Sequence, residues 1–177
     1  MKKLIILQVL LVILILGCNK SEQAKQPDQI AKLKTDEYVF QTDSLKRYKF
    51  PTHINDLVID RAKSTASEVF MVIVEPGKSV MHHKHDDTEQ VFYMLEGTGF
   101  LCIGADKKEY AVKPGDVIRI PVSTLHSIKT DSEKAIKYVC VDCFAQKQLE
   151  PTWDEHVKVV CKNNNWDFEK VISNGYE

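Results

Sequence analysis

The sequence lacks a long apolar run, a cluster of basic residues and an internal repeat. Its longest apolar stretch, residues 4–16, is interrupted only by Gln8. As a helix at ~1.5 Å per residue it covers about 20 Å, short of the ~30 Å hydrocarbon core of a bilayer, which disfavours a transmembrane helix. Lys and Arg are scattered and the formal net charge is −1, so the basic surface that nucleic acids require is missing. Without a repeat of 20–50 residues, a solenoid is excluded.

The first eighteen residues have the form of an export signal. Lys2 and Lys3 precede the apolar stretch, which is followed by Gly17 and Cys18. A basic start, a short apolar run and a small residue before the cut describe a secretory signal. The ending resembles the lipobox of bacterial lipoproteins, in which the cysteine is lipidated and becomes the mature N-terminus. We therefore predict export to the periplasmic or cell-surface side and a membrane anchor at Cys18; a plain signal peptide or an uncleaved anchor is the alternative.

The remaining chain divides into three parts by composition. Residues 19–36 are polar, rich in Gln and Lys, with too little apolar surface to offset the entropy of ordering them, as expected of a tether. From 37 to 150 short apolar runs alternate with turn residues, and 151–177 form a C-terminal extension. The chain is long enough for one domain of ordinary size.

The central part predicts an all-β domain. Turn signals containing Gly or Pro separate many short runs with strand composition, a pattern typical of a sandwich or a barrel. We expect strands at Asp56–Ala62, Glu68–Glu75, Ser79–His85, Gln90–Leu95, Gly99–Ile103, Glu109–Lys113, Asp116–Ile120, His126–Lys129 and Ala135–Val141. In the extension, Thr152 followed three residues later by Glu155 has the form of a capping box, which predicts a short helix.

Two stretches carry residue types suited to metal chemistry. In an extended chain alternate side chains share a face, so His83 and His85 point the same way, about 7 Å apart along the strand. Two such imidazoles can converge on one ion. A third imidazole, His126, follows a strand that breaks at Pro121.

The first stretch resembles the first motif of the cupin family. That motif has a Gly, five residues, His-x-His, three or four residues, a Glu, six residues and a Gly. Here Gly77, His83 and His85 are in register, Gln90 follows after four residues, and Gly97 follows after six. Gln90 thus stands where the family has its carboxylate ligand.

The second stretch resembles the second cupin motif, a Gly, five residues, Pro-x-Gly, two residues, a His, three residues and an Asn. Here Gly115, Pro121 and His126 match, Ser123 replaces the second Gly and Thr130 replaces the Asn. Seventeen residues separate the two stretches, a normal gap for a compact cupin.

The resemblance implies a single-domain cupin, a jelly-roll β-barrel with a short C-terminal helical tail. It also implies that His83, His85, Gln90 and His126 bind one divalent transition metal. Glu89 is the alternative fourth ligand, because both strand parities place apolar neighbours inward. Three imidazoles and one oxygen suit Mn, Fe, Co, Ni, Cu or Zn, and the ligand types do not select among them.

The neutral amide of Gln90 has a consequence for charge. A divalent ion held by three imidazoles and an amide keeps its full +2 charge, which favours an anionic ligand or substrate. Glu89 and Tyr93 are the side chains in these stretches expected to serve as general acid or base. We expect His53, His82 and Arg119 to lie at the surface or rim.

Three function classes follow. The first is a small-molecule metalloenzyme of the dioxygenase or sugar-isomerase type, since a metal with open positions acts as a Lewis acid. The second is a non-catalytic module that binds or senses a small ligand. The third is a metal-free structural barrel. Cupins commonly pair through sheet edges, so a homodimer is expected, and no catalytic residue is assigned because the fold alone does not define a reaction.

The cysteines are a separate question. Cys140 and Cys143 have CxxC spacing, but two residues three apart on a continuing strand face opposite ways, which disfavours a shared disulfide or metal. In an oxidising compartment Cys102, Cys140, Cys143 and Cys161 could form one or two structural bridges, and their pairing is left open.

Overall fold

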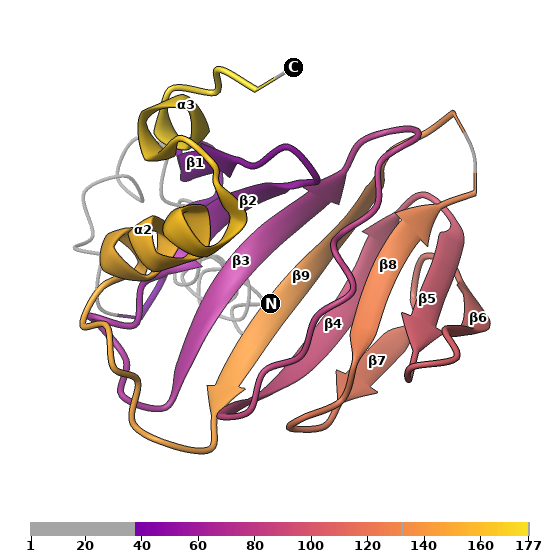
Figure 1. The fold of residues 1–177 in the computed structure, drawn as a ribbon, viewed down its shortest axis with the longest axis horizontal. Coiled ribbons are helices and arrows are strands. Elements are labelled where there is room, and N and C mark those ends of the chain that lie inside the picture. Colours follow the sequence, from indigo (N-terminus) through magenta and orange to yellow (C-terminus); the bar gives the residue numbers. More distant parts are fainter. Residues whose placement is uncertain (1–37, 132, 177) are drawn as a thin grey trace, which may run out of the picture. The chain divides into compact units, whose positions relative to one another are not determined.

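A computed structural model of the chain describes residues 38–131 and 133–176, and Figure 1 gives its elements. The strands are β1 (Lys46–Lys49), β2 (Ile54–Ile59), β3 (Ser67–Val74), β4 (Thr88–Glu96), β5 (Gly99–Ile103), β6 (Lys108–Val112), β7 (Val117–Ile120), β8 (His126–Thr130) and β9 (Ile136–Phe144). The helices are α2 (Trp153–Asn164) and α3 (Phe168–Ile172). This content confirms the all-β class with a short helical tail.

The strands form two antiparallel sheets. One sheet has six strands in the order β1-β2-β3-β9-β4-β7, and the other has three in the order β6-β5-β8. Strands distant in the sequence are neighbours, as where β9 lies between β3 and β4. This order is the jelly-roll connectivity that the two motifs predicted.

Alternating burial along the central strands defines the interior. In β3 and β9 every second side chain is buried, as the period of two in a strand requires. Most inward residues are apolar, including Phe70 and Tyr138. Two are carboxylic acids, Glu68 and Asp142, which are cross-strand partners. The inner face of the large sheet therefore carries two acids at positions where the alternating sequence pattern predicted apolar core residues.

The strand predicted over 79–85 does not form. This segment pairs with its neighbours only at two isolated bridges, Ser79 with Lys129 and His83 with His126. Because the chain runs beside β8 without a continuous ladder, the histidines of this segment occupy irregular backbone. Strand β1 and helix α3 were not predicted; β1 is short and its outward residues are charged.

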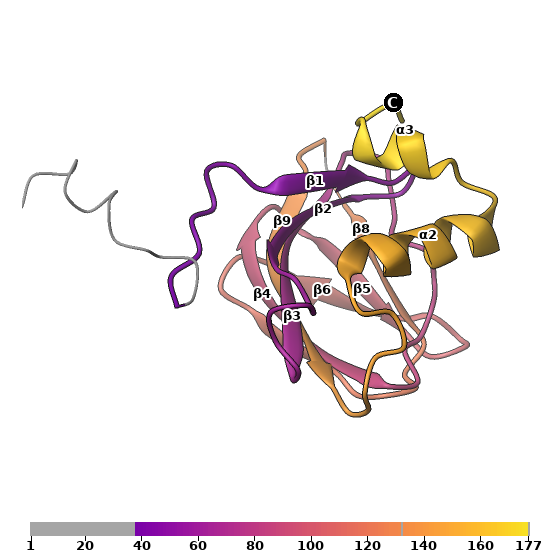
Figure 2. The same ribbon diagram turned by 90° about the vertical axis from the view of Figure 1, so that its left-hand side faces the viewer.

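Helix α2 begins as the capping box predicts, with the Thr152 hydroxyl accepting from the backbone N–H of Glu155. Its buried residues Trp153, Val157 and Cys161 belong to the main core. Both views show α2 and α3 beside β1 and β2 (Figure 1, Figure 2). At this contact Asp154 accepts hydrogen bonds from Lys46 and from the Tyr48 hydroxyl. The extension is therefore packed into the domain that it follows.

All four cysteines of the described residues are free thiols: Cys102, Cys140, Cys143 and Cys161. Along β9, Cys140 is buried and Cys143 is half-buried on the alternate face, as strand parity predicts for the CxxC pair. Cys161 lies in α2. The bridges considered from the sequence are not formed in this structure.

The predicted export signal and tether lie outside the described residues, so export and lipid anchoring at Cys18 stay predictions. Within residues 38–131 and 133–176, no helix combines the length and apolar character needed to cross a bilayer. The expected homodimer also stays a prediction.

Two turn glycines form a matched pair for testing the fold. Gly97 and Gly77 both have positive φ, +75° and +72°, a region that costs an L-residue about 1–2 kcal/mol. A Cβ on Gly97 would overlap the backbone carbonyl of Ala135, whereas a Cβ on Gly77 would meet nothing within 4 Å.

We therefore expect Gly77→Ala to lower the free energy of unfolding by about 1 kcal/mol and Gly97→Ala to lower it by at least about 2 kcal/mol more. Urea titrations followed by circular dichroism measure both. Equal losses for the two variants would show that the Gly97 turn is not packed against Ala135 as described.

Candidate metal centre

The barrel encloses a cavity of about 150 Å³ between its two sheets and the start of α2. Aromatic and aliphatic side chains make up much of its wall, among them Phe70, Phe92, Ile128 and Trp153. The polar side chains that reach it come from several elements and include all four predicted metal ligands. One cavity therefore brings together residues separated by more than forty positions in the sequence.

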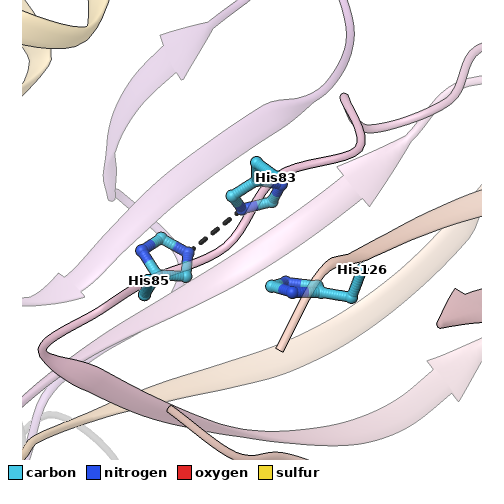
Figure 3. Close-up of side chains that lie close together, drawn as sticks. All are labelled: His83, His85 and His126. Carbon is cyan, nitrogen blue, oxygen red and sulfur yellow. Dashed lines mark hydrogen bonds between the residues drawn. The ribbon is translucent and has the colours of Figure 1, made fainter. Parts of the chain in front are cut away.

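Three imidazoles converge on this cavity (Figure 3). One ligand atom from each of His83, His85 and His126 lies within 4.8 Å of the other two. The Nε2 atoms of His83 and His85 are 3.0 Å apart. Two nitrogens that each lie ~2.1 Å from one ion, at about a right angle, are separated by ~3 Å. The spacing thus matches that of two ligands of a shared metal.

Backbone pairing joins the two histidine stretches. His83 and His126 exchange backbone hydrogen bonds of 2.9 and 2.8 Å. Before β8, Ser123 adopts a left-handed conformation with φ of +61°, and its N–H donates to the carbonyl of His85 at 2.6 Å. This backbone conformation explains why the cupin motif has Gly at that position.

Two of the rings have a fixed tautomer. The Nδ1 atom of His83 lies 2.7 Å from the carbonyl oxygen of Met81, and that of His126 lies 2.9 Å from the carbonyl oxygen of Thr124. Since a carbonyl only accepts, each Nδ1 carries the proton and donates it, which leaves the Nε2 lone pair directed elsewhere. The two backbone carbonyls therefore keep both rings in a form whose Nε2 atom can bind a metal as a neutral ligand.

The three rings are also uncharged at neutral pH. Burial lowers the pKa of His85 to about 3, and the neighbouring His83 and His126 lower it further in the same direction. Burial lowers the pKa of His126 to about 4 and depresses the pKa of His83 as well. Because a metal binds only the neutral imidazole, no proton competes for these nitrogens near pH 7.

Gln90 and Glu89 occupy opposite faces of β4. Gln90 is buried and lines the cavity, opposite Asp142 in the ladder. Glu89 is only partly covered, and it accepts a hydrogen bond of 2.5 Å from Arg119 on β7. Of the two side chains that the sequence left open, only Gln90 reaches the cavity.

One direct observation indicates that the residues present fit a metal ion. His126 Nε2 and Gln90 Oε1 are buried acceptors without a hydrogen-bond partner among the described residues. A buried polar atom left unpaired costs roughly 1–3 kcal/mol. Both atoms belong to the ligand set that the motifs imply, and a cation between them would satisfy both. The donor set is three nitrogens and one oxygen, which suits a divalent transition metal.

A buried charged group beside this centre was not predicted from the sequence. Arg61 binds Glu68 through two hydrogen bonds of 2.8 and 2.6 Å, and both side chains are at most 3% exposed. Across the ladder Glu68 lies opposite Asp142, which accepts from Gln90. The only available signal was the position of Glu68 and Asp142 in strands that otherwise alternate apolar residues.

Burial sets the proton affinity of this group. It raises the pKa of Glu68 to about 7; Asp142 adds to the rise, and Arg61 opposes it. Burial also raises the pKa of Asp142. Burial thus leads this pair of carboxylic acids to keep a proton to a higher pH than free carboxylic acids do.

The expectations for the other side chains singled out in the sequence had mixed outcomes. Arg119 is exposed on the outer face, as predicted. Tyr93, offered with Glu89 as an acid or base, is 48% exposed and does not line the cavity. His82 is half-buried and contacts the Gly104 carbonyl. The surface position expected for His53 is wrong: this ring lines the cavity, and burial lowers its pKa to about 3.

Both histidine stretches lie within a match to a protein-family model. Residues 70–142 match the Cupin_2 model, described as a cupin domain. An uncharacterised protein of Methanocaldococcus jannaschii is 33% identical over 78 residues, 44% of this chain and 61% of that protein. Quercetin 2,3-dioxygenase of Bacillus subtilis is 30% identical over 123 residues, 66% of this chain and 36% of the enzyme. The chain thus spans less than two thirds of either relative.

Solved structures share the fold at lower identity. A predicted oxalate decarboxylase from Thermotoga maritima aligns with a TM-score of 0.54 and 19% identity, covering 60% of this chain and 98% of that one. The polyketide cyclase RemF from Streptomyces resistomycificus aligns with a TM-score of 0.53 and 20% identity, covering 60% and 78%. These likenesses show a common barrel and do not indicate a common substrate.

The buried acid pair predicts a characteristic pH dependence in protein freed of metal by a chelator. The ordinary pKa of Glu is about 4.5 and that of folded Glu68 is about 7, so between these values the folded chain binds more protons than the unfolded one. Stability from this group is therefore lost as pH rises from 4.5 to 7. The buried histidines act in the opposite direction, so the comparison must be a difference between variants.

We expect the unfolding free energy of Glu68→Gln, relative to wild type, to rise by on the order of 1–3 kcal/mol between pH 4.5 and 7.5. Urea titrations at several pH values measure it. Glu109→Gln, at an exposed position paired with Lys129, controls for the same chemical change at the surface. A difference that stays constant with pH would contradict the proton held at Glu68.

Proposed function

The chain carries a domain of the cupin superfamily, and on that premise we propose that it binds one divalent transition-metal ion and acts as a small-molecule dioxygenase. The ligands are His83, His85, His126 and Gln90. The observation that carries the proposal is the pair of buried, unpartnered acceptors, His126 Nε2 and Gln90 Oε1, in the cavity that also receives the other two imidazoles.

The charge of the site favours oxygen anions as ligands. All four ligands are neutral, so the ion keeps its +2 charge in a low-dielectric cavity. When bound, the metal supplies a Lewis-acid centre with coordination positions open to substrate and O₂. The chain's own contribution is to hold His83 and His126 in the Nδ1–H tautomer and to place apolar side chains, among them Phe92 and Ile128, in the wall of the cavity.

The size and walls of the cavity limit the substrate. Its volume of about 150 Å³ is close to that of an engineered protein cavity that holds one benzene ring. Aromatic rings from Phe70, Phe92 and Trp153 contribute to the wall. Among the described lining residues there is no lysine, and the guanidinium of Arg61 is bound at two nitrogens by Glu68. Its third nitrogen, Nη1, has no hydrogen-bond partner in the part of the chain that the structure describes but lies 3.7 Å from the carboxylate of Glu150, so the charge of Arg61 is balanced by two acids. A single oxygenated ring therefore fits better than a sugar phosphate.

One of the two curated relatives favours a dioxygenase over a sugar isomerase. One of the similar curated proteins is named for dioxygenase chemistry on quercetin, an aromatic molecule. Since this chain spans only 36% of that enzyme, the substrate itself is not transferred. We infer the class of substrate from the cavity and the class of reaction from the relative and the neutral ligand set together.

The metal ligands are tested by metal content. We expect the purified domain to hold about one transition-metal ion per chain, measured by plasma mass spectrometry, and His85→Ala and His126→Ala to lose it. His82→Ala, beside the cluster and outside the cavity lining, should keep it. At the fourth position, Gln90→Ala should weaken binding by about 10-fold or more, while Glu89→Ala should bind as wild type. Wild-type protein without metal, after incubation with excess Mn, Fe, Co, Ni, Cu and Zn, would refute the proposal.

The reaction is tested with the metal-loaded domain and oxygen. We expect O₂ uptake with catechol-sized substrates on an oxygen electrode, with loss of at least about 100-fold in His126→Ala, because the open metal positions disappear with the ion. Metal at full occupancy with no O₂ uptake across single-ring catechols, hydroxypyrones and flavonols would overturn the dioxygenase assignment and favour a non-catalytic binding module.

A further inference from the structure

A row of three polar side chains crosses the inner face of the large sheet. Glu68 on β3 lies opposite Asp142 on β9, and Asp142 lies opposite Gln90 on β4. The three are 1%, 6% and 6% exposed. Cross-strand partners face the same side of a sheet and their side chains touch. The row therefore connects the fourth ligand of the proposed metal to residues outside the ligand set.

A glutamine ligand has a problem that a glutamate ligand does not have. Its amide presents an oxygen that binds cations and a nitrogen that does not, and rotation by 180° exchanges the two. An inward Gln90 is thus a ligand only if something selects the orientation. A carboxylate needs no such selection, because its two oxygens are equivalent.

Asp142 provides the selection. Its Oδ1 accepts a hydrogen bond of 2.8 Å from Gln90 Nε2 and one of 3.2 Å from the Cys140 thiol. An acceptor at this position requires the amide nitrogen to face Asp142. The amide oxygen is then turned away, and it is the atom that has no partner among the described residues.

Asp142 is itself held in place. It lies beside Glu68, its partner across the β3–β9 ladder, and both carboxyl oxygens of Glu68 accept hydrogen bonds from the Arg61 guanidinium. Each group is buried, so none of these bonds competes with bulk water. The chain of contacts runs from Arg61 through Glu68 and Asp142 to the amide, and it fixes the amide before any ion arrives.

We propose that Asp142 is a positioning residue for the metal, which acts by turning the Gln90 amide so that its oxygen faces the three imidazoles. This inference rests on the proposed function, since it needs Gln90 to be a ligand. It assigns to β9 a part in metal binding that neither histidine stretch contains.

The test first removes the acceptor that Asp142 provides, and then replaces Gln90 by a residue that needs no orienting acceptor. Asp142→Ala leaves Gln90 Nε2 without its partner, so the amide is free to rotate. Asp142→Asn keeps an acceptor oxygen, and its new amide N–H finds Glu68. In Asp142→Ala with Gln90→Glu, the symmetric carboxylate offers an oxygen in either orientation.

The probe is Co²⁺, added to chelator-treated full-length protein and followed by its visible absorption, with affinity from competition against a chromophoric chelator. We expect Asp142→Ala to bind about 10–100-fold more weakly than wild type, with an altered spectrum, as is usual when a ligand loses its orienting partner. Asp142→Asn should bind within about threefold of wild type. The double variant should bind at least as tightly as wild type, because its ligand is also charged.

The control is Asp56→Ala, which removes a second buried carboxylate. Asp56 accepts two hydrogen bonds from Arg47 and does not line the cavity. If lost stability alone weakened metal binding, Asp56→Ala would weaken it too, and Gln90→Glu would not restore the Asp142→Ala protein.

The outcomes separate the two proposals. Wild-type protein that takes up no Co²⁺ refutes the metal site itself. Wild type that binds while Asp142→Ala binds equally well leaves the metal site standing and refutes the positioning role. Failure of the double variant to recover affinity also refutes that role, since a symmetric ligand should need no orientation.

Discussion

The interior of this barrel depends on one constraint, that buried polar atoms must find partners. Imidazoles, amides, carboxylic acids and one guanidinium lie in this cavity among aromatic and aliphatic side chains, and they include His83, His85, His126, Gln90, Glu68, Asp142 and Arg61. Most of their hydrogen-bonding atoms are satisfied by one another or by the backbone. Five buried side-chain atoms have no partner among the described residues: Asn55 Oδ1, Arg61 Nη1, Trp153 Nε1 and the acceptors of the two candidate ligands, His126 Nε2 and Gln90 Oε1. The last two belong to residues that line the cavity reached by the other two rings. Their lack of partners is the physical basis for placing a cation there.

Charge is distributed unevenly around that cavity. The metal side offers only neutral ligands, so a bound ion would keep its whole charge for the substrate. The carboxylic acids lie on the next two strands of the sheet. Asp142 on β9 contacts the Gln90 amide, and Glu68 on β3 contacts Arg61. A carboxylate at position 90 would have been forced against Asp142, and like charges at that distance repel strongly in a low-dielectric interior. Glutamine as the proposed fourth ligand is therefore compatible with a buried acid beside it.

The spacing of the two histidine stretches predicted the barrel and the three converging rings, because strand parity and motif spacing can both be read from the sequence before the fold is known. Parity could not choose between Gln90 and Glu89, since both sets of neighbours are apolar. In the structure the two side chains differ in their contacts: Gln90 donates to Asp142 on the inner face, and Glu89 accepts from Arg119 on the outer face. The strand predicted at 79–85 failed for a similar reason, because a ladder needs a neighbour along its whole length, and pairing there is confined to two bridges.

The sequence by itself determined the all-β class, the turn positions and the candidate ligands, because hydrophobic period and motif spacing are local properties of the chain. Only the tertiary structure decided that Arg61, Glu68 and Asp142 stand behind Gln90, that His53 lines the cavity, and that Trp153 of the C-terminal helix closes part of its wall. These contacts join residues up to a hundred positions apart. Their partners are set by strand order and register, which follow from the packing of the whole barrel.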